Sequence, residues 1–117
     1  MSDERRQSPR RSMTLKIRVD GPKGRASLTA RDVSKEGVFV ESPKPLPIGS
    51  RVDCRLELPG QGSERGPRIE FAAEVRHQSN KYTTDDGAGP FRGFGVRITR
   101  IGVEEQQTLF AFLESVA

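Results

Sequence analysis

The sequence predicts a mainly all-β domain, in which about six short antiparallel strands form a small barrel and one helix follows at the C-terminus. Two observations lead to this fold class. Apolar and polar residues alternate in short segments separated by turns rich in Gly and Pro, and a helical period begins only near the end of the chain. Strands that each keep one polar face usually close into a barrel or curl into a sandwich. The chain has 117 residues, which suits one domain with one modest core.

The first three strands are predicted at residues 15–19, 26–34 and 37–41. In the first, aliphatic residues alternate with cationic ones, which is typical of a strand with one buried face and one solvent-exposed face. A turn at residues 20–24 separates the first two strands, and a tight reversal at 34–37 separates the second from the third.

Three further strands are predicted at residues 52–58, 69–76 and 94–98, again from alternation. The connecting loops are a stiff proline-rich loop at 42–50, a glycine-rich loop at 59–67 and a long polar loop at 79–92. From Gly102 the apolar period becomes helical and predicts a helix over about residues 102–116. The inward face of this helix is predicted to consist of Val103, Gln106, Leu109, Phe110, Leu113 and Val116.

Residues 1–13 are predicted to form a flexible, arginine-rich arm that precedes a single barrel domain at residues 14–117. The segment from Glu4 to Arg11 has four arginines and no apolar side chain, and Pro9 disfavours a helix through it. Residues 1–31 hold nine lysines and arginines against three acidic residues and so carry +6, whereas the rest of the chain carries −2 and the net charge is +4. Because arginine grips phosphate in a bidentate fork and lies flat on bases, this arm indicates an anion site.

A second candidate ligand-binding segment contains Asp32, Ser34 and Gly37. The carboxylate of Asp32 can accept two hydrogen bonds, which suits the donor pair on the Watson–Crick edge of guanine that adenine lacks. Ser34 offers a hydroxyl to a phosphate or a base edge, and Gly37 permits a positive φ and the close approach of a ligand. If the arm folds back over this reversal, a ligand with both phosphate and guanine satisfies both segments.

The two segments resemble the signature of the PilZ domain family, which are receptors for the bacterial second messenger cyclic di-GMP. That signature is RxxxR on an N-terminal arm followed by [DN]xSxxG, and it is matched here by Arg6-Gln7-Ser8-Pro9-Arg10 and Asp32-Val33-Ser34-Lys35-Glu36-Gly37. Arg5 completes the form RRxxxR, and the resemblance covers the whole chain. It implies a six-stranded antiparallel PilZ-like barrel that binds cyclic di-GMP at its rim through Arg5, Arg6, Arg10, Asp32, Ser34 and Gly37.

The resemblance also implies how such a receptor works. The arm orders on the ligand, and the changed surface is read by a separate downstream protein, because no output domain is visible in the sequence. The family resemblance suggests that the signal controls motility or cell polarity. Neither a cofactor nor a metal is expected, and the partner protein is unidentified.

Two other functions stay open at this point. One is a PilZ-like protein-interaction adaptor that acts without nucleotide. The other is a small barrel that binds single-stranded nucleic acid, which usually needs aromatic stacking platforms. Aromatic residues make up 6% of the chain and Trp is absent, so the sequence disfavours nucleic acid.

The remaining residues carry little chemistry. The sequence has no visible nucleophile–base set, so the domain is not expected to be an enzyme. Cys54 falls on the apolar side of a strand and is expected in the core, and the lone His77 lacks companions for a metal site. The chain has no apolar run that could span a membrane and no secretory signal, and its single cysteine excludes an intrachain disulfide. A cytoplasmic location is therefore expected.

Overall fold

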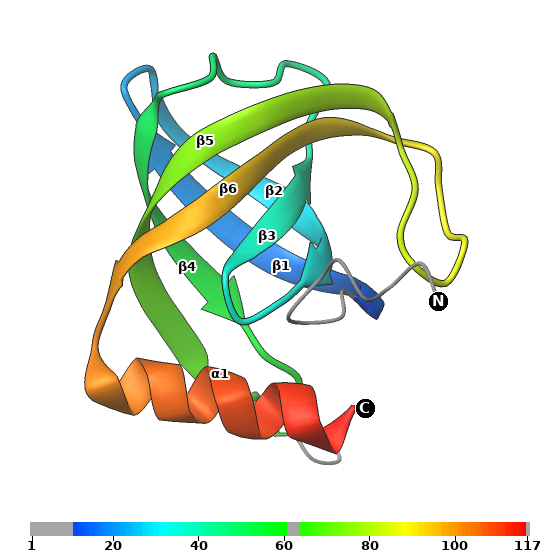
Figure 1. Cartoon of the computed structure of the whole chain (residues 1–117). Helices are drawn as coiled ribbons and strands as arrows, with labels where there is room; N and C mark the ends of the chain where they lie inside the picture. The colour runs from blue at the N-terminus through cyan, green and yellow to red at the C-terminus, as the bar shows by residue number, and fades with distance from the viewer. Residues whose placement is uncertain (1–10, 61–63, 117) are drawn as a thin grey trace.

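The structure, a computed structural model, describes residues 11–60 and 64–116 as a closed β-barrel of six strands with one helix beside it (Figure 1). The elements are β1 (Arg11–Gly21), β2 (Gly24–Val33), β3 (Gly37–Glu41), β4 (Arg51–Glu57), β5 (Arg68–Tyr82), β6 (Phe91–Ile101) and α1 (Val103–Ser115). All paired strands are antiparallel, and the order β1-β2-β3-β6-β5-β4 closes because β4 also pairs with β1. The predicted fold class is confirmed.

The core of the barrel follows from the alternation in the sequence. Alternate residues of each strand point inward, as Ile17 and Val19 do in β1 and Cys54 and Leu56 do in β4, all of them almost fully buried. The residues between them face outward and are mostly charged. Cys54 is a core residue, as the sequence predicts.

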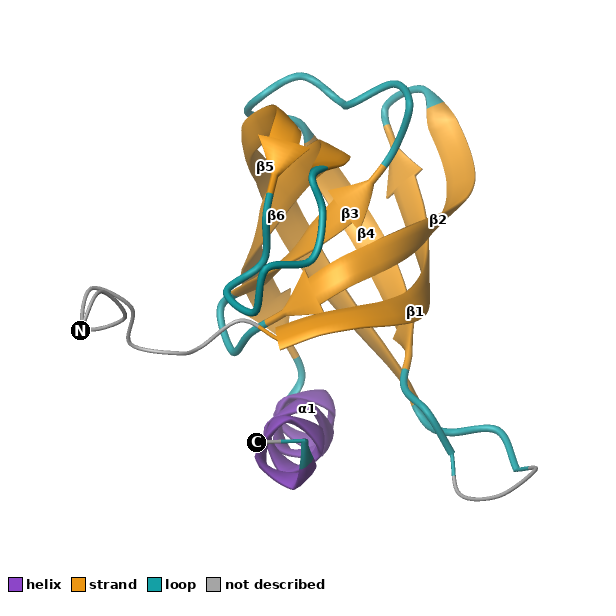
Figure 2. Cartoon of the chain, turned by 90° about the vertical axis from the view of Figure 1, so that its right-hand side faces the viewer, coloured by secondary structure: helices purple, strands orange, loops and turns teal. Residues whose placement is uncertain are grey.

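Two strands are longer than the sequence indicates. β5 continues to Tyr82 and β6 begins at Phe91, so residues 83–90, not 79–92, connect them. The extra length is a ribbon in which Ser79 pairs with Gly93 and Tyr82 with Phe91. Both faces of the ribbon are largely exposed, so its side chains are mostly polar on both faces. The sequence there lacks the alternation of apolar and polar residues that predicts a strand. Figure 2 shows the connecting loop hanging down beside β2 and β3.

The helix α1 lies across one end of the barrel (Figure 1). Leu109 is buried, and Phe110, Phe112 and Leu113 pack partly against the core. The predicted inward face is therefore wrong in part, since Val103 is 70% exposed, Val116 is 40% exposed, and Gln106 is also exposed. The large ring of Phe112 takes the covered position because it has more apolar area to remove from water than either valine.

The strand β1 begins at Arg11, inside the segment predicted to be the arm. The rest of the arm, with Arg5, Arg6 and Arg10, lies outside the described residues. Among the residues that are described, no helix is long and apolar enough to cross a membrane.

Candidate functional site

The reversal between β2 and β3 is held by the hydroxyl of Ser34. The backbone N–H groups of Glu36 and Gly37 both donate to Ser34 Oγ at 3.2 Å, and the hydroxyl lies 3.3 Å from the Gly37 carbonyl, to which it donates. The Ser34 N–H donates to the same carbonyl at 2.9 Å. Ser34 is 1% exposed, so its hydroxyl fixes the shape of the turn in this structure.

Gly37 is required by packing and not by its own backbone angle. Its φ is not positive, in contrast to the expectation from the sequence; the positive-φ glycines of the described residues are Gly24, Gly49, Gly87 and Gly89. A Cβ at Gly37 would collide with the carbonyl oxygen of Val96, because β3 and β6 run very close together here. The side of Gly37 that lacks a side chain is filled by β6.

Asp32 lies on the outer side of β2, opposite Phe39 of β3. Phe39 alternates with the core residues Val38 and Val40, and a register shift between Ala30 and Asp32 places Asp32 opposite it, so neither side chain belongs to the core cluster. The carboxylate is nonetheless 0% exposed. Its Oδ1 accepts a hydrogen bond of 3.0 Å from the Phe39 N–H, and its Oδ2 accepts one from the hydroxyl of Tyr82, which is fifty residues away in the sequence.

An aromatic stack covers this part of the outer wall. The rings of Phe39 and Tyr82 are 4.0 Å apart between centroids and almost parallel, at 7°. The His77 ring lies beside both, 6.1 Å from the Phe39 ring and 6.2 Å from the Tyr82 ring between centroids, and it fills the space where a Cβ on Gly95 would stand. The stack joins β3 to β5 over β6, so the lone His77 is a packing residue and not an isolated polar one.

Sequence reasoning missed Tyr82. It treated the segment from residue 79 as a polar loop and assigned no role to Phe39, so neither residue was considered for the site. One signal was available: Tyr82 is the only tyrosine of the chain and stands in a segment with no other aromatic residue nearby before Phe91.

The ribbon end that carries Tyr82 is fastened to β2 by Arg31. The guanidinium of Arg31 lies over the Phe91 ring, 4.7 Å from its centroid, and Nε donates to Glu41 Oε1 at 2.7 Å. A further hydrogen bond of 2.9 Å reaches Thr14 Oγ1 of β1. This arginine therefore has structural partners on three other strands.

Cationic groups surround the β2–β3 reversal. The ammonium of Lys35 lies over the Phe110 ring of α1, 4.9 Å from its centroid, which links the reversal to the helix.

On the outer wall, a hollow of about 410 Å³ is lined by Glu36, Arg76, His77, Gly95, Val96 and Arg97. Arg97 makes no ion pair within the described residues, so its charge is available to an anion.

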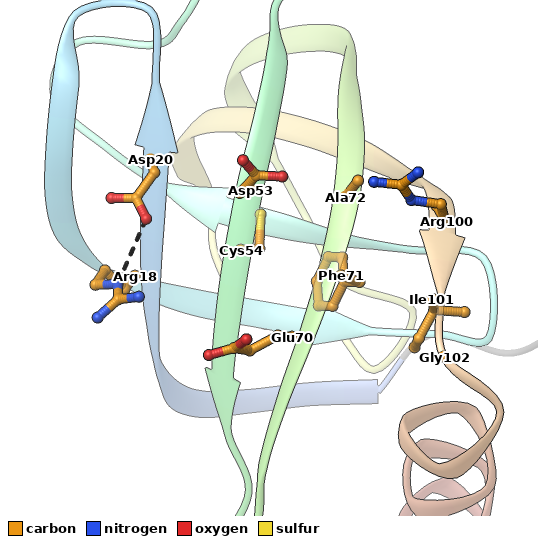
Figure 3. A pocket seen from close by; sticks show the side chains of 10 residues that line it. All are labelled: Arg18, Asp20, Asp53, Cys54, Glu70, Phe71, Ala72, Arg100, Ile101 and Gly102. Atoms are coloured by element: carbon orange, nitrogen blue, oxygen red, sulfur yellow. Dashed lines mark ion pairs between the residues drawn. The ribbon is translucent and has the colours of Figure 1, made fainter.

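A second hollow, over β1, β4 and the start of β5, has a different character (Figure 3). Its volume is about 370 Å³, and it is lined by three carboxylates, Asp20, Asp53 and Glu70, and by Arg18 and Arg100 among others. Arg18 Nε lies 3.6 Å from Asp20 Oδ2 (dashed line in Figure 3). The excess of carboxylates would repel a phosphate, so this hollow is a poor anion site.

The same region explains why Cys54 is inert. Burial raises the pKa of the Cys54 thiol to about 12, and the nearby carboxylates of Asp53 and Asp20 add to the effect. A thiol is nucleophilic as thiolate, so Cys54 is a poor nucleophile at neutral pH. Within residues 11–60 and 64–116, no group of three or more His, Cys, Asp or Glu side chains is arranged to hold a metal ion.

The structure brings the three residues of the second motif together and places the start of the described chain beside them. Asp32, Ser34 and Gly37 all lie at the end of the barrel that faces α1. In the register between β1 and β2, Arg11 pairs with Val33 and Ser12 with Asp32. The arm therefore joins the barrel directly alongside the second motif.

The chain is thus a small closed antiparallel barrel whose β2–β3 reversal contains the buried Asp32 and Ser34. The sequence model of the PilZ domain matches residues 4–115, and the chain therefore belongs to the PilZ family of cyclic di-GMP receptor and adaptor domains. No curated protein matches the chain.

A solved structure with the same fold is that of the Bacillus subtilis inhibitor of motility MotI/DgrA, with a TM-score of 0.76 and 20% sequence identity. The alignment covers 97% of this chain and 51% of the other, so the chain spans about half the length of that protein. At this identity the similarity extends to the fold alone.

Proposed function

We propose that this domain is a receptor for cyclic di-GMP that passes the signal to a separate partner protein. The observation that carries the proposal is the register between β1 and β2, which joins the arginine-rich arm to the barrel beside Asp32. Membership of the PilZ family supports it independently.

The proposed contacts divide between the two motifs. Arg5, Arg6 and Arg10 engage the ligand phosphates and the O6 and N7 acceptors of guanine, since a guanidinium suits both geometries. Asp32 accepts from the two donors of the guanine Watson–Crick edge. Adenine has no such donor pair, and the carboxylate would therefore favour the guanine nucleotide.

Ser34 and Gly37 have a supporting role in this proposal. The Ser34 hydroxyl accepts hydrogen bonds from the backbone of Glu36 and Gly37 and so fixes the shape of the turn. The fixed turn then orients its backbone groups toward the ligand. Gly37 allows β3 to approach β6 and so keeps the reversal tight.

Ordering of the arm on the ligand would change the surface offered to the partner. The Lys35–Phe110 contact gives a second connection, from the motif to α1. The similar solved structure is that of an inhibitor of motility, which makes motility a reasonable first process in which to look for the partner.

Calorimetric titration with cyclic di-GMP tests the proposal, with cyclic di-AMP and GTP as controls. Binding of the first ligand alone supports it. Absence of binding to all three would favour a second function, an adaptor that acts without nucleotide. One observation favours that second function: Asp32 is fully buried and already bonded on both oxygens.

A further inference from the structure

The carboxylate proposed to read guanine is closed off in this structure. Asp32 is 0% exposed, and its Oδ2 is taken by the hydroxyl of Tyr82. The Tyr82 ring also lies flat on Phe39, with 4.0 Å between ring centroids, and so covers the carboxylate as well as bonding to it. A base edge cannot reach Asp32 while Tyr82 stays in this position.

We infer that Tyr82 is a residue of the nucleotide site that competes with guanine for Asp32, and that its hydroxyl must leave Oδ2 before the ligand is read. The inference rests on the proposed function. It assigns Tyr82 a role in setting affinity: the free protein is stabilised by the Tyr82–Asp32 hydrogen bond, and the ligand has to replace it. A guanine edge brings two donors to the carboxylate and can do so, whereas an adenine edge cannot.

The position of Tyr82 in the fold permits this movement. It is the last residue of β5, at the end of the ribbon, and the pairing of β5 with β6 is irregular between Ser79 and Tyr82. The loop that follows contains Gly87 and Gly89, with φ values of 92° and 119°. None of these residues belongs to the core cluster, so the ribbon end can shift without disturbing the barrel interior.

Of the two hydrogen bonds described at Asp32, only the one from Tyr82 involves the ribbon. The bond from the Phe39 N–H to Oδ1 is internal to the β2–β3 pair and does not involve the ribbon. It holds the carboxylate in a fixed orientation, so that release of Tyr82 uncovers an acceptor that is already placed for the ligand.

The variant Tyr82→Phe tests the inference, because it removes the competing hydroxyl and retains the ring on Phe39. Calorimetry should show cyclic di-GMP binding about threefold to tenfold tighter than to the wild type, the range expected for one net hydrogen bond. Affinity for cyclic di-AMP should not rise. In an Asp32→Ala background, the same change at Tyr82 should have no effect, since there is no carboxylate to compete for.

A matched control separates loss of the hydroxyl from loosening of the loop. Thr84 Oγ1 is bonded to Asp86 at 2.6 Å and accepts from the Ala88 N–H at 3.0 Å, without contact to Asp32. Thr84→Val loosens the loop and leaves Tyr82 intact. If Thr84→Val raises affinity as much as Tyr82→Phe does, the effect belongs to the loop and the inference is overturned.

A second measurement follows Tyr82 directly. Because the chain has one tyrosine, protein labelled with 3-fluorotyrosine gives a single ¹⁹F resonance from this site. Saturating cyclic di-GMP should shift this resonance toward the chemical shift seen in the Asp32→Ala protein. An unchanged chemical shift in a protein that binds the ligand contradicts the inference.

The two levels of the argument can fail separately. If neither the wild type nor Tyr82→Phe binds cyclic di-GMP, the proposed function fails and the inference fails with it. If the wild type binds and Tyr82→Phe binds equally or more weakly, the inference alone fails. Binding by Tyr82→Phe but not by the wild type would support the inference in its strongest form.

Discussion

The change Asp32→Ala removes the acceptor of two hydrogen bonds that tie three strands together. The Phe39 N–H donates to Oδ1 at 3.0 Å, and the Tyr82 hydroxyl donates to Oδ2. Asp32 and Phe39 are both buried, at 0% and 1% exposure, so water cannot take the place of the lost carboxylate at the Phe39 N–H. Asp32 is therefore expected to stabilise the fold as well as bind the ligand.

The size of the effect follows from these contacts. A buried N–H left without a partner costs about 1–3 kcal/mol, and loss of the charged acceptor adds to this at Tyr82. Tyr82 is half-buried, so its hydroxyl can donate to water instead, and the lost Tyr82 hydrogen bond contributes less to the destabilisation than the lost Phe39 one. We expect the free energy of unfolding to fall by about 2–3 kcal/mol, and Tm to fall by roughly 10–20 °C for a domain of this size.

Urea unfolding measures the change, and Asp53→Ala is the matched control. Asp53 is an exposed carboxylate on β4 that makes no ion pair or hydrogen bond within the described residues, so its loss should alter stability by less than about 0.5 kcal/mol. Titration at a temperature where both variants are folded should then show weaker cyclic di-GMP binding and reduced discrimination against cyclic di-AMP for Asp32→Ala alone. An Asp32→Ala protein as stable as Asp53→Ala would refute the structural reasoning, and full retention of selectivity would refute its role in reading the base.

Four further predictions concern other parts of the molecule. Arg6→Ala and Arg10→Ala should each weaken cyclic di-GMP binding by about 1.5–3 kcal/mol, or tenfold to more than a hundredfold, with an unchanged thermal melt; unaltered affinity in both would remove them from the site. Gly37→Ala should lower the free energy of unfolding by about 1–3 kcal/mol because its Cβ collides with the backbone of β6, and urea unfolding would detect this. For Cys54, burial raises the pKa to about 12 in the fold, above the ordinary thiol value of 9.0, so stability should be constant below pH 9 and decline as pH rises above it; Cys54→Ala should lack that decline in pH-dependent unfolding, and parallel curves would contradict the assignment. Lys35→Met should cost about 0.5–1 kcal/mol and speed amide hydrogen exchange in α1, whereas unchanged exchange there would show that the reversal and the helix are not linked.

The fold could be predicted from the sequence because its signals are local. Alternation fixes which residues of each strand point inward, as for Ile17 and Val19, and Gly and Pro mark the turns between strands. The motif residues Asp32, Ser34 and Gly37 were likewise found from spacing, and the structure places them at one end of the barrel.

The partners of those residues could not be predicted from spacing. The register shift in β2 puts Asp32 opposite Phe39, and no sequence pattern indicates a shift of this kind. Tyr82 reaches Asp32 from fifty residues away because a two-stranded ribbon with polar side chains extends beyond the barrel wall. The helix face was shifted for a similar reason, since the packing of Phe112 depends on the barrel end that it meets.

The central claim, that the arm and the second motif close on one ligand, is tested most directly by limited trypsin digestion with and without cyclic di-GMP. Bonds after Arg5, Arg6, Arg10 and Arg11 report on the arm, and the bond after the exposed Arg65, in the loop between β4 and β5, serves as the internal control. We predict that saturating cyclic di-GMP slows cleavage at the arm selectively, that cyclic di-AMP does not, and that added salt weakens the protection by screening the phosphate contacts. Equal cleavage rates at the arm with and without saturating cyclic di-GMP would show that it does not close over the nucleotide and would contradict the account.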